Sequence, residues 1–404
     1  MSKIENIRTI LLSAEYGDEK HPEILECFPN GPKRTIGLVE VTLENGVKGY
    51  GEGYLGVFAP QVFKSIIELC TPYLIGKDGF NILRRYKDLC SVCDYWSLQG
   101  AARHSTSAIE IALVDAKSKT QKCPAYKLFG NSKKEKIEVY GSGGICDTKE
   151  HFIEELELLK KLGIKKYKIR AVPSDINKTA WVLKEARKYE IDIGIDMCQN
   201  LADPPIDADD VINYIKYVKK VSKEKILFLE EAVGPMDIKG FKKLKETLNI
   251  DICGGEVITT PLEMIERINL DIYNFVQPDA SVIGGMHAVK EVFKYAKTKP
   301  VVHAWGGPVA IMANYHVAFG CNGNLVEFPM IPYKLEPIMF GDQKVIKDGK
   351  LLRPENPGIG ITMNDKIEKD FSFDKESVYS CVVVDRGQPK DSCLLYTSPS
   401  PRDR

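Results

Sequence analysis

The pattern of hydrophobic and polar positions divides the chain into two parts with different orders of strand-like and helical segments. Before about residue 130, two strand-like runs cover residues 36–43 and 48–53, and the turn between them contains Asn45-Gly46, a strong hairpin signal. Three segments with helical periodicity follow, at residues 61–70, 81–90 and 101–119. In the last of these, Ala108, Ile111 and Ala112 share one face. Residues 1–130 therefore predict an α+β unit.

From residue 131 to about 335, short apolar runs alternate with amphipathic segments. The apolar runs cover residues 138–141, 166–170, 192–197, 226–230, 252–255, 274–277, 300–303 and 324–327. The clearest helical segments cover residues 149–162, 178–189, 208–221 and 240–248. Such alternation is typical of parallel strands, and eight units in this length favour a TIM-type α/β barrel over an open doubly wound sheet. The pattern is weakest between the last two runs, at residues 304–323.

The rhythm changes again after residue 335. Residues 341–358 predict a small extended excursion, and we expect the region 336–385 to return to the N-terminal unit and complete it. The last residues, 387–404, resemble translated sequencing-adapter sequence, so we interpret them as a non-native tail and leave them out of the fold. A genomic reading frame that runs unbroken through this tail would contradict that interpretation.

Composition and charge narrow the class of protein. Hydrophobic residues make up 44% and charged residues 28%, an ordinary globular balance. The 56 Lys and Arg equal the 56 Asp and Glu, so no net field favours nucleic acid or an anionic membrane as a partner. No apolar run approaches the roughly 18 residues of a membrane span, and residues 1–6 lack the order of a signal peptide. With 11 cysteines expected to be reduced thiols, these features predict a cytoplasmic protein.

Acidic residues recur where successive predicted strands end. Asp196 ends the third strand, Glu230 ends the fourth, and Glu256 follows the fifth. In a parallel barrel these ends open on one face, where the carboxylates would repel one another unless a cation neutralised them. Carboxylate oxygens without Cys or His favour a hard cation, so we expect Mg²⁺, with Mn²⁺ as a substitute. One such acid alone would be an ordinary surface residue, but three on consecutive strands indicate a metal site.

Candidate acid and base groups occupy the other strand ends. Lys168 and Arg170 end the second strand, and strand alternation aims both to the same side. His303 ends the seventh strand and Asp279 follows the sixth, so the carboxylate can orient the imidazole and raise its basicity. Glu327 ends the eighth strand and, if protonated, could donate a hydrogen bond to developing negative charge.

Three further stretches carry a family resemblance, at residues 107–117 (SAIEIALVDAK), 124–130 (PAYKLFG) and 357–361 (PGIGI). With the strand-end residues, they make the chain from about residue 4 to about 371 resemble the enolase superfamily, specifically its mandelate racemase subgroup. That superfamily is itself the established example of a Lys or His base working with Mg²⁺. The resemblance implies a modified TIM barrel with a capping domain. It also implies metal ligands at Asp196, Glu230 and Glu256, and an Asp279–His303 dyad specific to the subgroup.

The sequence departs from the subgroup's pattern at three places. Arg170 replaces the second lysine of a Lys-x-Lys pair, and arginine stays protonated, so it is a poor proton acceptor. Cys198 stands where relatives often carry Asn or His, so the third strand offers no obvious proton donor. Glu231-Ala232 replaces a frequent Glu-Pro, which we expect to be a tolerated loop change.

These departures favour one reaction over another. With His303 as the only competent base, elimination fits better than racemisation, and the resemblance implies an acid sugar dehydratase, a homo-oligomer with a small-molecule carboxylate substrate. A racemase or epimerase of 2-hydroxy acids, with Arg170 as an unusual base, and a non-catalytic member are the alternatives. In the family, two loops close over the barrel mouth, here residues 16–30 with His21 and 54–60 with Phe58. Which acid sugar is used stays open.

Overall fold

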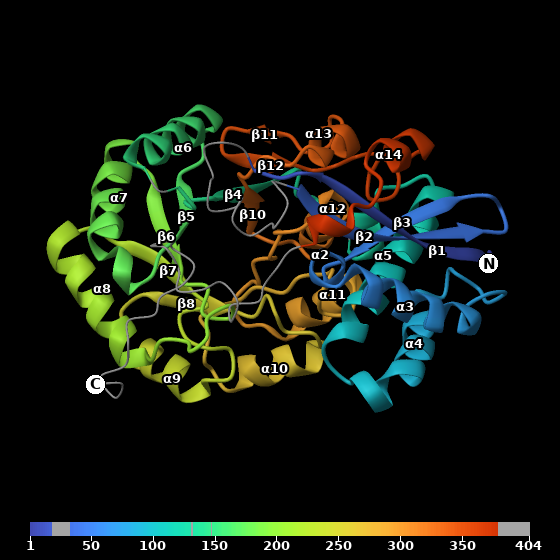
Figure 1. Cartoon of the computed structure of the whole chain (residues 1–404), viewed down its shortest axis with the longest axis horizontal. Coiled ribbons are helices and arrows are strands. Elements are labelled where there is room, and N and C mark those ends of the chain that lie inside the picture. The colour runs from blue at the N-terminus through green and yellow to red at the C-terminus, as the bar shows by residue number, and fades with distance from the viewer. Residues whose placement is uncertain (18–32, 131, 147, 379–404) are drawn as a thin grey trace.

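The computed structural model describes residues 1–17, 33–130, 132–146 and 148–378 (Figure 1). Two of the expectations above lie outside these residues, the tail at 387–404 and nearly all of the loop at 16–30, including His21. In the view of Figure 1, a parallel barrel occupies one side of the molecule. A three-stranded sheet with its helices occupies the other.

The N-terminal unit is an antiparallel sheet covered by helices. Its strands are β1 (Ile4–Glu15), β2 (Lys33–Leu43) and β3 (Lys48–Gly53), with β2 in the middle. The helices are α2 (Leu55–Phe58), α3 (Pro60–Cys70), α4 (Ile82–Ser97) and α5 (Ala101–Thr120). Glycines in β3 let α5 approach closely, since a Cβ at Gly51 would lie 1.9 Å from the carbonyl oxygen of Ala108. The strand β1 was not predicted, because its buried positions do not alternate regularly.

The barrel has the expected parallel order. Its strands are β4 (Lys136–Ser142), β5 (Lys166–Arg170), β6 (Asp192–Asp196), β7 (Ile226–Glu230), β8 (Asp251–Gly254), β9 (Phe275–Val276) and β10 (Leu325–Pro329). The predicted seventh strand is reduced to a single bridge, between Val302 and Val326 of β10. On its other side, the amides of Val301 and His303 donate to the carbonyls of Val276 and Pro278. These bonds close the barrel and hold His303 at its mouth.

Seven helices cover the described barrel, namely α6 (Lys149–Leu162), α7 (Ile176–Lys188), α8 (Ala208–Ser222), α9 (Ile238–Thr247), α10 (Pro261–Asn269), α11 (Met286–Tyr295) and α12 (Pro308–Gly320). Every residue of α12 is buried. The helix contacts β3 and the 3₁₀ turn η2 (Ala125–Leu128) of the N-terminal unit as well as α11 of the barrel. A helix buried on all sides has no polar face, which explains the weak pattern at residues 304–323. Among the described helices, none combines the length and the apolar character that crossing a bilayer requires.

The C-terminal segment contributes to both parts. After α13 (Leu335–Phe340), the hairpin β11 (Ile346–Lys347) and β12 (Lys350–Leu352) pairs with β4 and so extends the barrel sheet. The chain touches the N-terminal unit at Tyr333, which bridges Tyr16, and again at Gly358, which bridges Pro124. The helix α14 (Asp365–Asp370) then leads to a bridge between Ser372 and Leu12. Short 3₁₀ turns lie at η1 (Thr71–Tyr73), η3 (Pro173–Asp175) and η4 (Lys375–Ser377).

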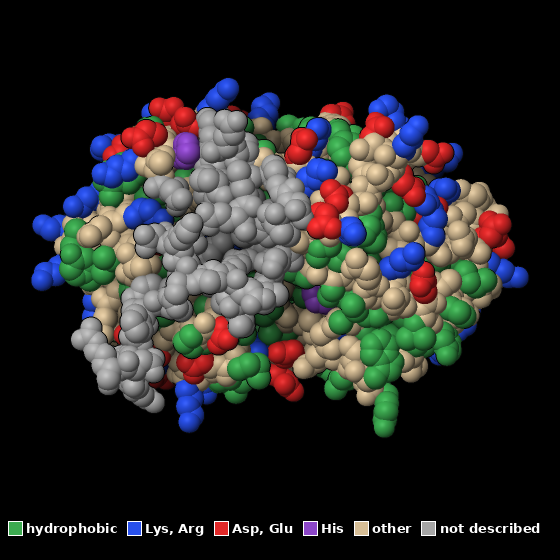
Figure 2. Space-filling model, in the orientation of Figure 1, with side chains coloured by type: hydrophobic (Ala, Val, Ile, Leu, Met, Phe, Trp, Pro, Cys, Tyr) green, Lys and Arg blue, Asp and Glu red, His purple; other side chains and the backbone are tan. Residues whose placement is uncertain are grey.

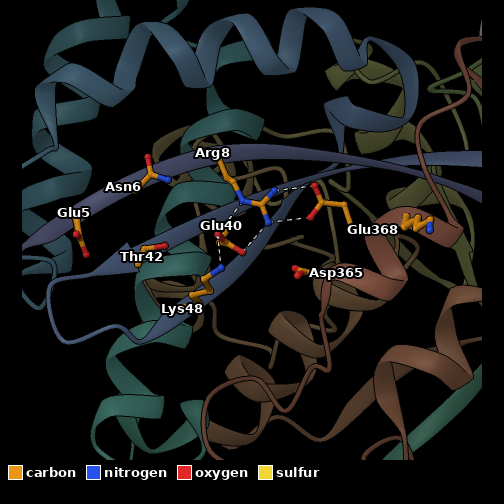
Figure 3. A pocket seen from close by; sticks show the side chains of 9 residues that line it. Glu5, Asn6, Arg8, Glu40, Thr42, Lys48, Asp365 and Glu368 are labelled. Carbon is orange, nitrogen blue, oxygen red and sulfur yellow. Dashed lines mark hydrogen bonds and ion pairs between the residues drawn. The ribbon is translucent and has the colours of Figure 1, made fainter.

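An arginine fastens the C-terminal helix to the N-terminal sheet (Figure 3). Arg8 of β1 lies between two carboxylates, with Nε 2.9 Å from Glu40 of β2 and Nη1 2.8 Å from Glu368 of α14. Lys48 also contacts Glu40, at 3.2 Å, and these side chains line an open pocket. Every charge named here has a partner of the opposite sign, so the pocket is a structural junction.

The face of the molecule in Figure 2 carries charges of both signs. Lys and Arg side chains alternate with Asp and Glu over the described barrel and sheet, without a large field of one sign on this face. Exposed apolar side chains gather instead around α4, including Leu83, Tyr95, Trp96 and Leu98. The equal totals of acid and base therefore reflect a mixed surface here.

A buried glutamate joins the two parts of the fold. Glu52 of β3 accepts hydrogen bonds from the amides of Gly307, at 2.7 Å, and Ala310, at 3.0 Å, at the start of α12. It thus caps a helix of the other part and satisfies two amides that have no partner within the helix. Burial outweighs these bonds and raises the pKa of Glu52 from its ordinary value of 4.5 to about 7.

The raised pKa of Glu52 predicts a pH dependence of stability. Between about pH 4.5 and 7 the folded protein binds this proton and the unfolded chain does not, so the free energy of unfolding falls as pH rises. The loss from this group is about 3 kcal/mol. We expect Glu52→Gln to flatten the slope by that amount in urea unfolding at pH 5, 6, 7 and 8. Glu68→Gln, an exposed control on α3, should keep the wild-type slope. An unchanged slope in Glu52→Gln would contradict the assignment.

Candidate active site

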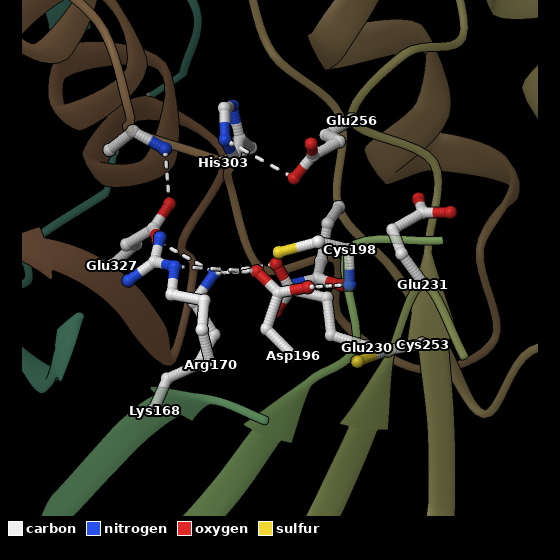
Figure 4. Close-up of polar contacts among 12 residues, drawn as sticks. Lys168, Arg170, Asp196, Cys198, Glu230, Glu231, Cys253, Glu256, His303 and Glu327 are labelled. Carbon is white, nitrogen blue, oxygen red and sulfur yellow. Dashed lines mark hydrogen bonds and ion pairs between the residues drawn. The ribbon is translucent and has the colours of Figure 1, made fainter. Parts of the chain in front are cut away.

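The carboxylates expected from the sequence meet at one end of the barrel (Figure 4). Asp196 and Glu230 are the last residues of β6 and β7 and lie opposite each other in the parallel register. Glu256 follows β8 by two residues. Asp196 and Glu230 are buried, whereas Glu256 is partly exposed. The fold therefore brings together all three residues predicted to hold a metal.

A lysine lies among these carboxylates. Nζ of Lys168 is 2.5 Å from Glu230, 2.8 Å from Glu327 and 3.7 Å from Asp196. Burial disfavours its charge, but the surrounding carboxylates dominate and hold the pKa of Lys168 well above its ordinary value. Gln277 supports the same group, since its Nε2 donates to Glu230 at 2.5 Å. Lys168 is thus a fixed positive charge within the acidic cluster.

The imidazole of His303 lies between two carboxylates. Its Nδ1 is 2.8 Å from Asp279 and its Nε2 is 3.3 Å from Glu256. Asp279 is itself oriented by the amide of Ser281 and by Nδ2 of Asn314. Burial opposes the charged imidazole, but Glu256 and Asp279 outweigh it and raise the pKa of His303 to about 10. The dyad predicted from the sequence therefore exists, with Asp279 fixing Nδ1 and leaving Nε2 toward the site.

The opposite side of the mouth is formed by Arg170. Its Nη1 donates to the carbonyl of Gly143 at 2.8 Å, its Nε is 3.8 Å from Asp196, and its guanidinium stacks on Trp305 at 4.1 Å. The carboxylate of Asp196 helps to raise the pKa of Arg170 above its ordinary value, against the effect of burial. Arg170 stays charged and cannot take up a proton.

Glu327 lies between a lysine and a backbone amide. Its Oε2 accepts the amide hydrogen of Ala304 at 2.7 Å, and its Oε1 pairs with Lys168. Burial alone would favour the neutral acid, but Lys168 and His303 hold the pKa of Glu327 below its usual range. In this arrangement its oxygens face a lysine and a backbone amide, and the donor role considered from the sequence would require its protonation.

The site has the charge and the donor chemistry for a hard divalent cation. Burial, with neighbouring carboxylates adding to its effect, raises the pKa of Glu230 to about 7 and that of Glu231 to about 8. In the described chain, Oε2 of Glu231 is buried without a hydrogen-bond partner. The donors are all oxygens, as Mg²⁺ prefers. Among the described residues, no group of three or more His, Cys, Asp or Glu side chains is arranged to hold a metal ion. Lys168 and His303 contact the carboxylate oxygens instead.

Three residues of the site were not selected from the sequence. Gln277 lies just after β9, so the strand-end rule could have identified it. Trp305 follows His303 by two residues, which is a weaker signal. Tyr54, whose ring meets that of His303 edge-on at 6.2 Å, begins the loop at residues 54–60 that the family resemblance placed over the mouth, although the residue itself was not selected. Cys198, noted above as a departure, has a pKa raised by burial and stays a neutral thiol.

Comparison with known families agrees with this geometry. The family described as "Enolase C-terminal domain-like" matches residues 151–367, more than half of the chain. The family described as "Mandelate racemase / muconate lactonizing enzyme, N-terminal domain" matches residues 27–130. The chain belongs to the enolase superfamily, in its mandelate racemase subgroup. This enolase superfamily enzyme thus has both domains expected from the sequence resemblance.

Several proteins resemble this enolase superfamily enzyme over nearly their whole length. An arabinonate dehydratase of Saccharolobus solfataricus is 26% identical, covering 91% of this chain and 99% of the relative. A D-xylonate dehydratase of Haloferax volcanii is 25% identical, covering 84% and 87%. Among solved structures, the 3,6-anhydro-D-galactonate cycloisomerase of Zobellia galactanivorans has a TM-score of 0.79 at 26% identity, covering 92% of this chain and 99% of that one.

Proposed function

We propose that this protein is a magnesium-dependent acid sugar dehydratase, a cytoplasmic hydro-lyase that removes the proton next to a carboxylate and eliminates the 3-hydroxyl as water. One observation carries the proposal: His303 is oriented by Asp279 at 2.8 Å, while Arg170 across the mouth is tied to Gly143 and stays charged. A single competent base suits elimination, whereas one-step racemisation needs a base on each face of the α-carbon. Relatives named as arabinonate and xylonate dehydratases support the same reaction type.

The acidic cluster would hold the metal. Asp196, Glu230 and Glu256 are the residues that would bind Mg²⁺, with Mn²⁺ as a substitute. When bound, the ion supplies positive charge that stabilises the substrate carboxylate as it gains electron density. Lys168 and Arg170 add positive charge from the side chains of β5.

The proton movements follow from the dyad. Nε2 of His303 takes the α-proton, and the electrons of the C–H bond form a carbon–carbon double bond as the 3-hydroxyl leaves. Asp279 holds Nδ1–H and stabilises the imidazolium that results. The imidazolium then returns its proton to the departing hydroxyl, so that water leaves from the same face. The enol product converts to a 2-keto-3-deoxy sugar acid. For this cycle His303 must begin neutral. Glu256 would therefore have to give up its contact with Nε2 and bind the metal instead.

A substrate screen tests the proposal. Purified protein with Mg²⁺ is incubated with a library of mono- and diacid sugars, and semicarbazide traps any 2-keto-3-deoxy product. We expect product from one or a few sugars, lost on adding EDTA and restored by Mg²⁺. No product from any sugar, together with α-proton exchange in D₂O, would contradict dehydration and support the racemase alternative.

A further inference from the structure

A second arginine borders the site from the N-terminal unit. Arg34, the second residue of β2, is only 3% exposed. Its guanidinium carbon lies 4.8 Å from the ring centre of Tyr16 and 5.6 Å from that of Tyr54. Tyr333 packs against Tyr16 and donates its hydroxyl to the Arg34 backbone carbonyl at 3.2 Å. The guanidinium therefore occupies an aromatic pocket.

The described residues leave this charge without a carboxylate partner. Within the described chain Arg34 forms no ion pair, and its buried Nε–H has no hydrogen-bond acceptor. Glu52 is the carboxylate whose charge it senses, but both oxygens of Glu52 are engaged by amides of α12. A buried guanidinium with an unsatisfied Nε–H and no carboxylate in contact is costly, because each buried donor without a partner loses its hydration. The pocket is thus short of negative charge.

Arg34 is close to the reacting groups. The ring of Tyr54 that contacts Arg34 also contacts the ring of His303, at 6.2 Å. Tyr16, the other ring against Arg34, is near enough to Arg170 to sense its charge. One side chain therefore separates Arg34 from each flank of the barrel mouth. Tyr54 therefore lies against both the guanidinium of Arg34 and the imidazole at which the α-carbon would sit.

We propose that Arg34 binds the second carboxylate of a dicarboxylic sugar acid, so that the enzyme prefers diacid over monoacid sugars. This inference rests on the proposed dehydratase function and names its substrate class. A carboxylate suits the pocket better than a hydroxyl, because a guanidinium binds it through two parallel hydrogen bonds and the pair cancels the buried charge. Under the proposed function the substrate's other carboxylate would lie at the metal that the acidic cluster holds, so the two ends of a diacid would meet two separate positive charges.

Kinetics with matched substrates test the inference. A diacid sugar and the monoacid of the same length and configuration are compared in wild type, Arg34→Met and Arg34→Lys. We expect wild type to favour the diacid at least tenfold in kcat/KM. Arg34→Met should lower kcat/KM for the diacid roughly 100-fold, mainly through KM, and change the monoacid little. Arg34→Lys should restore part of the loss. Arg84→Met, an exposed control on α4, should behave as wild type.

The outcomes separate the inference from the proposed function. Equal losses for both substrates in Arg34→Met, or a wild-type preference for the monoacid, would overturn the inference. If no sugar acid is turned over, the proposed function fails, and calorimetry then decides the role of Arg34 alone. The inference on Arg34 is supported if wild type binds the diacid more tightly than the monoacid and Arg34→Met does not. The inference is overturned if wild type and Arg34→Met bind the diacid with equal affinity. Thermal unfolding checks that the variant is folded.

Discussion

Replacing His303 with asparagine is expected to lower kcat by about 10³- to 10⁴-fold on any acid sugar that the enzyme dehydrates. The amide can still bond to Asp279, so the loop after Pro278 keeps its position, but it cannot take up a proton at the atom that replaces Nε2. Substrate binding should change little, because the imidazole is not among the groups proposed to hold either carboxylate. The steady-state kcat and the rate of α-proton exchange in D₂O should fall by similar factors.

The control for this prediction is a second histidine. His151 lies in the first turn of α6 and contacts neither His303 nor the carboxylate cluster in the described structure, so His151→Asn should leave kcat unchanged. Asp279→Asn should give a smaller loss and move the pH profile, because it affects the orientation and basicity of His303 without removing it. Full activity in His303→Asn would show that another group takes the proton.

Replacing Glu256 with glutamine is expected to weaken Mn²⁺ or Mg²⁺ binding roughly 100-fold and to abolish turnover at ordinary metal concentrations. Glu256 is the most exposed of the three carboxylates and does not contact Lys168, so its loss should leave the buried network of Asp196 and Glu230 intact. Binding is followed by the electron spin resonance of Mn²⁺, a signal that does not depend on activity.

Thermal unfolding gives a second measure of the same site. Metal that binds only the folded state raises the melting temperature, so Mg²⁺ should stabilise wild type and the exposed control Glu266→Gln on α10. The stabilisation should be small in Glu256→Gln. Wild-type Mn²⁺ affinity in Glu256→Gln would place the metal elsewhere.

Much of the site could be predicted because it depends on local signals. Asp196 and Glu230 end short apolar runs, and a parallel barrel places all such ends on one face. The position of His303 followed from the same rule, although its strand is reduced to one bridge. What the rule cannot supply is the pairing among the side chains. Lys168 was expected at the end of its strand on the same side as Arg170, and only the three-dimensional structure shows it inserted between the carboxylates.

The family resemblance placed the loop at residues 54–60 over the barrel mouth, but the individual contacts of the N-terminal unit could not be predicted. Tyr54 and Arg34 reach the mouth through packing between distant parts of the chain, and no periodicity in their own segments reports such contacts. The strand β1 was missed for a related reason, since part of it is buried by the returning C-terminal segment near Ser372 rather than by its own helices. The weak signal at α12 has the same origin, because burial from both parts removes its polar face.

The burial of α12 limits where this protein can be divided. A barrel produced without residues 1–130 would expose to water the side of α12 that now contacts β3 and η2 and would leave two amides at its start without Glu52. Such a fragment would expose a contiguous apolar surface, and we expect it to aggregate. Exchange of capping domains between relatives therefore has to carry α12 along with the incoming sheet, even though the two lie far apart in sequence.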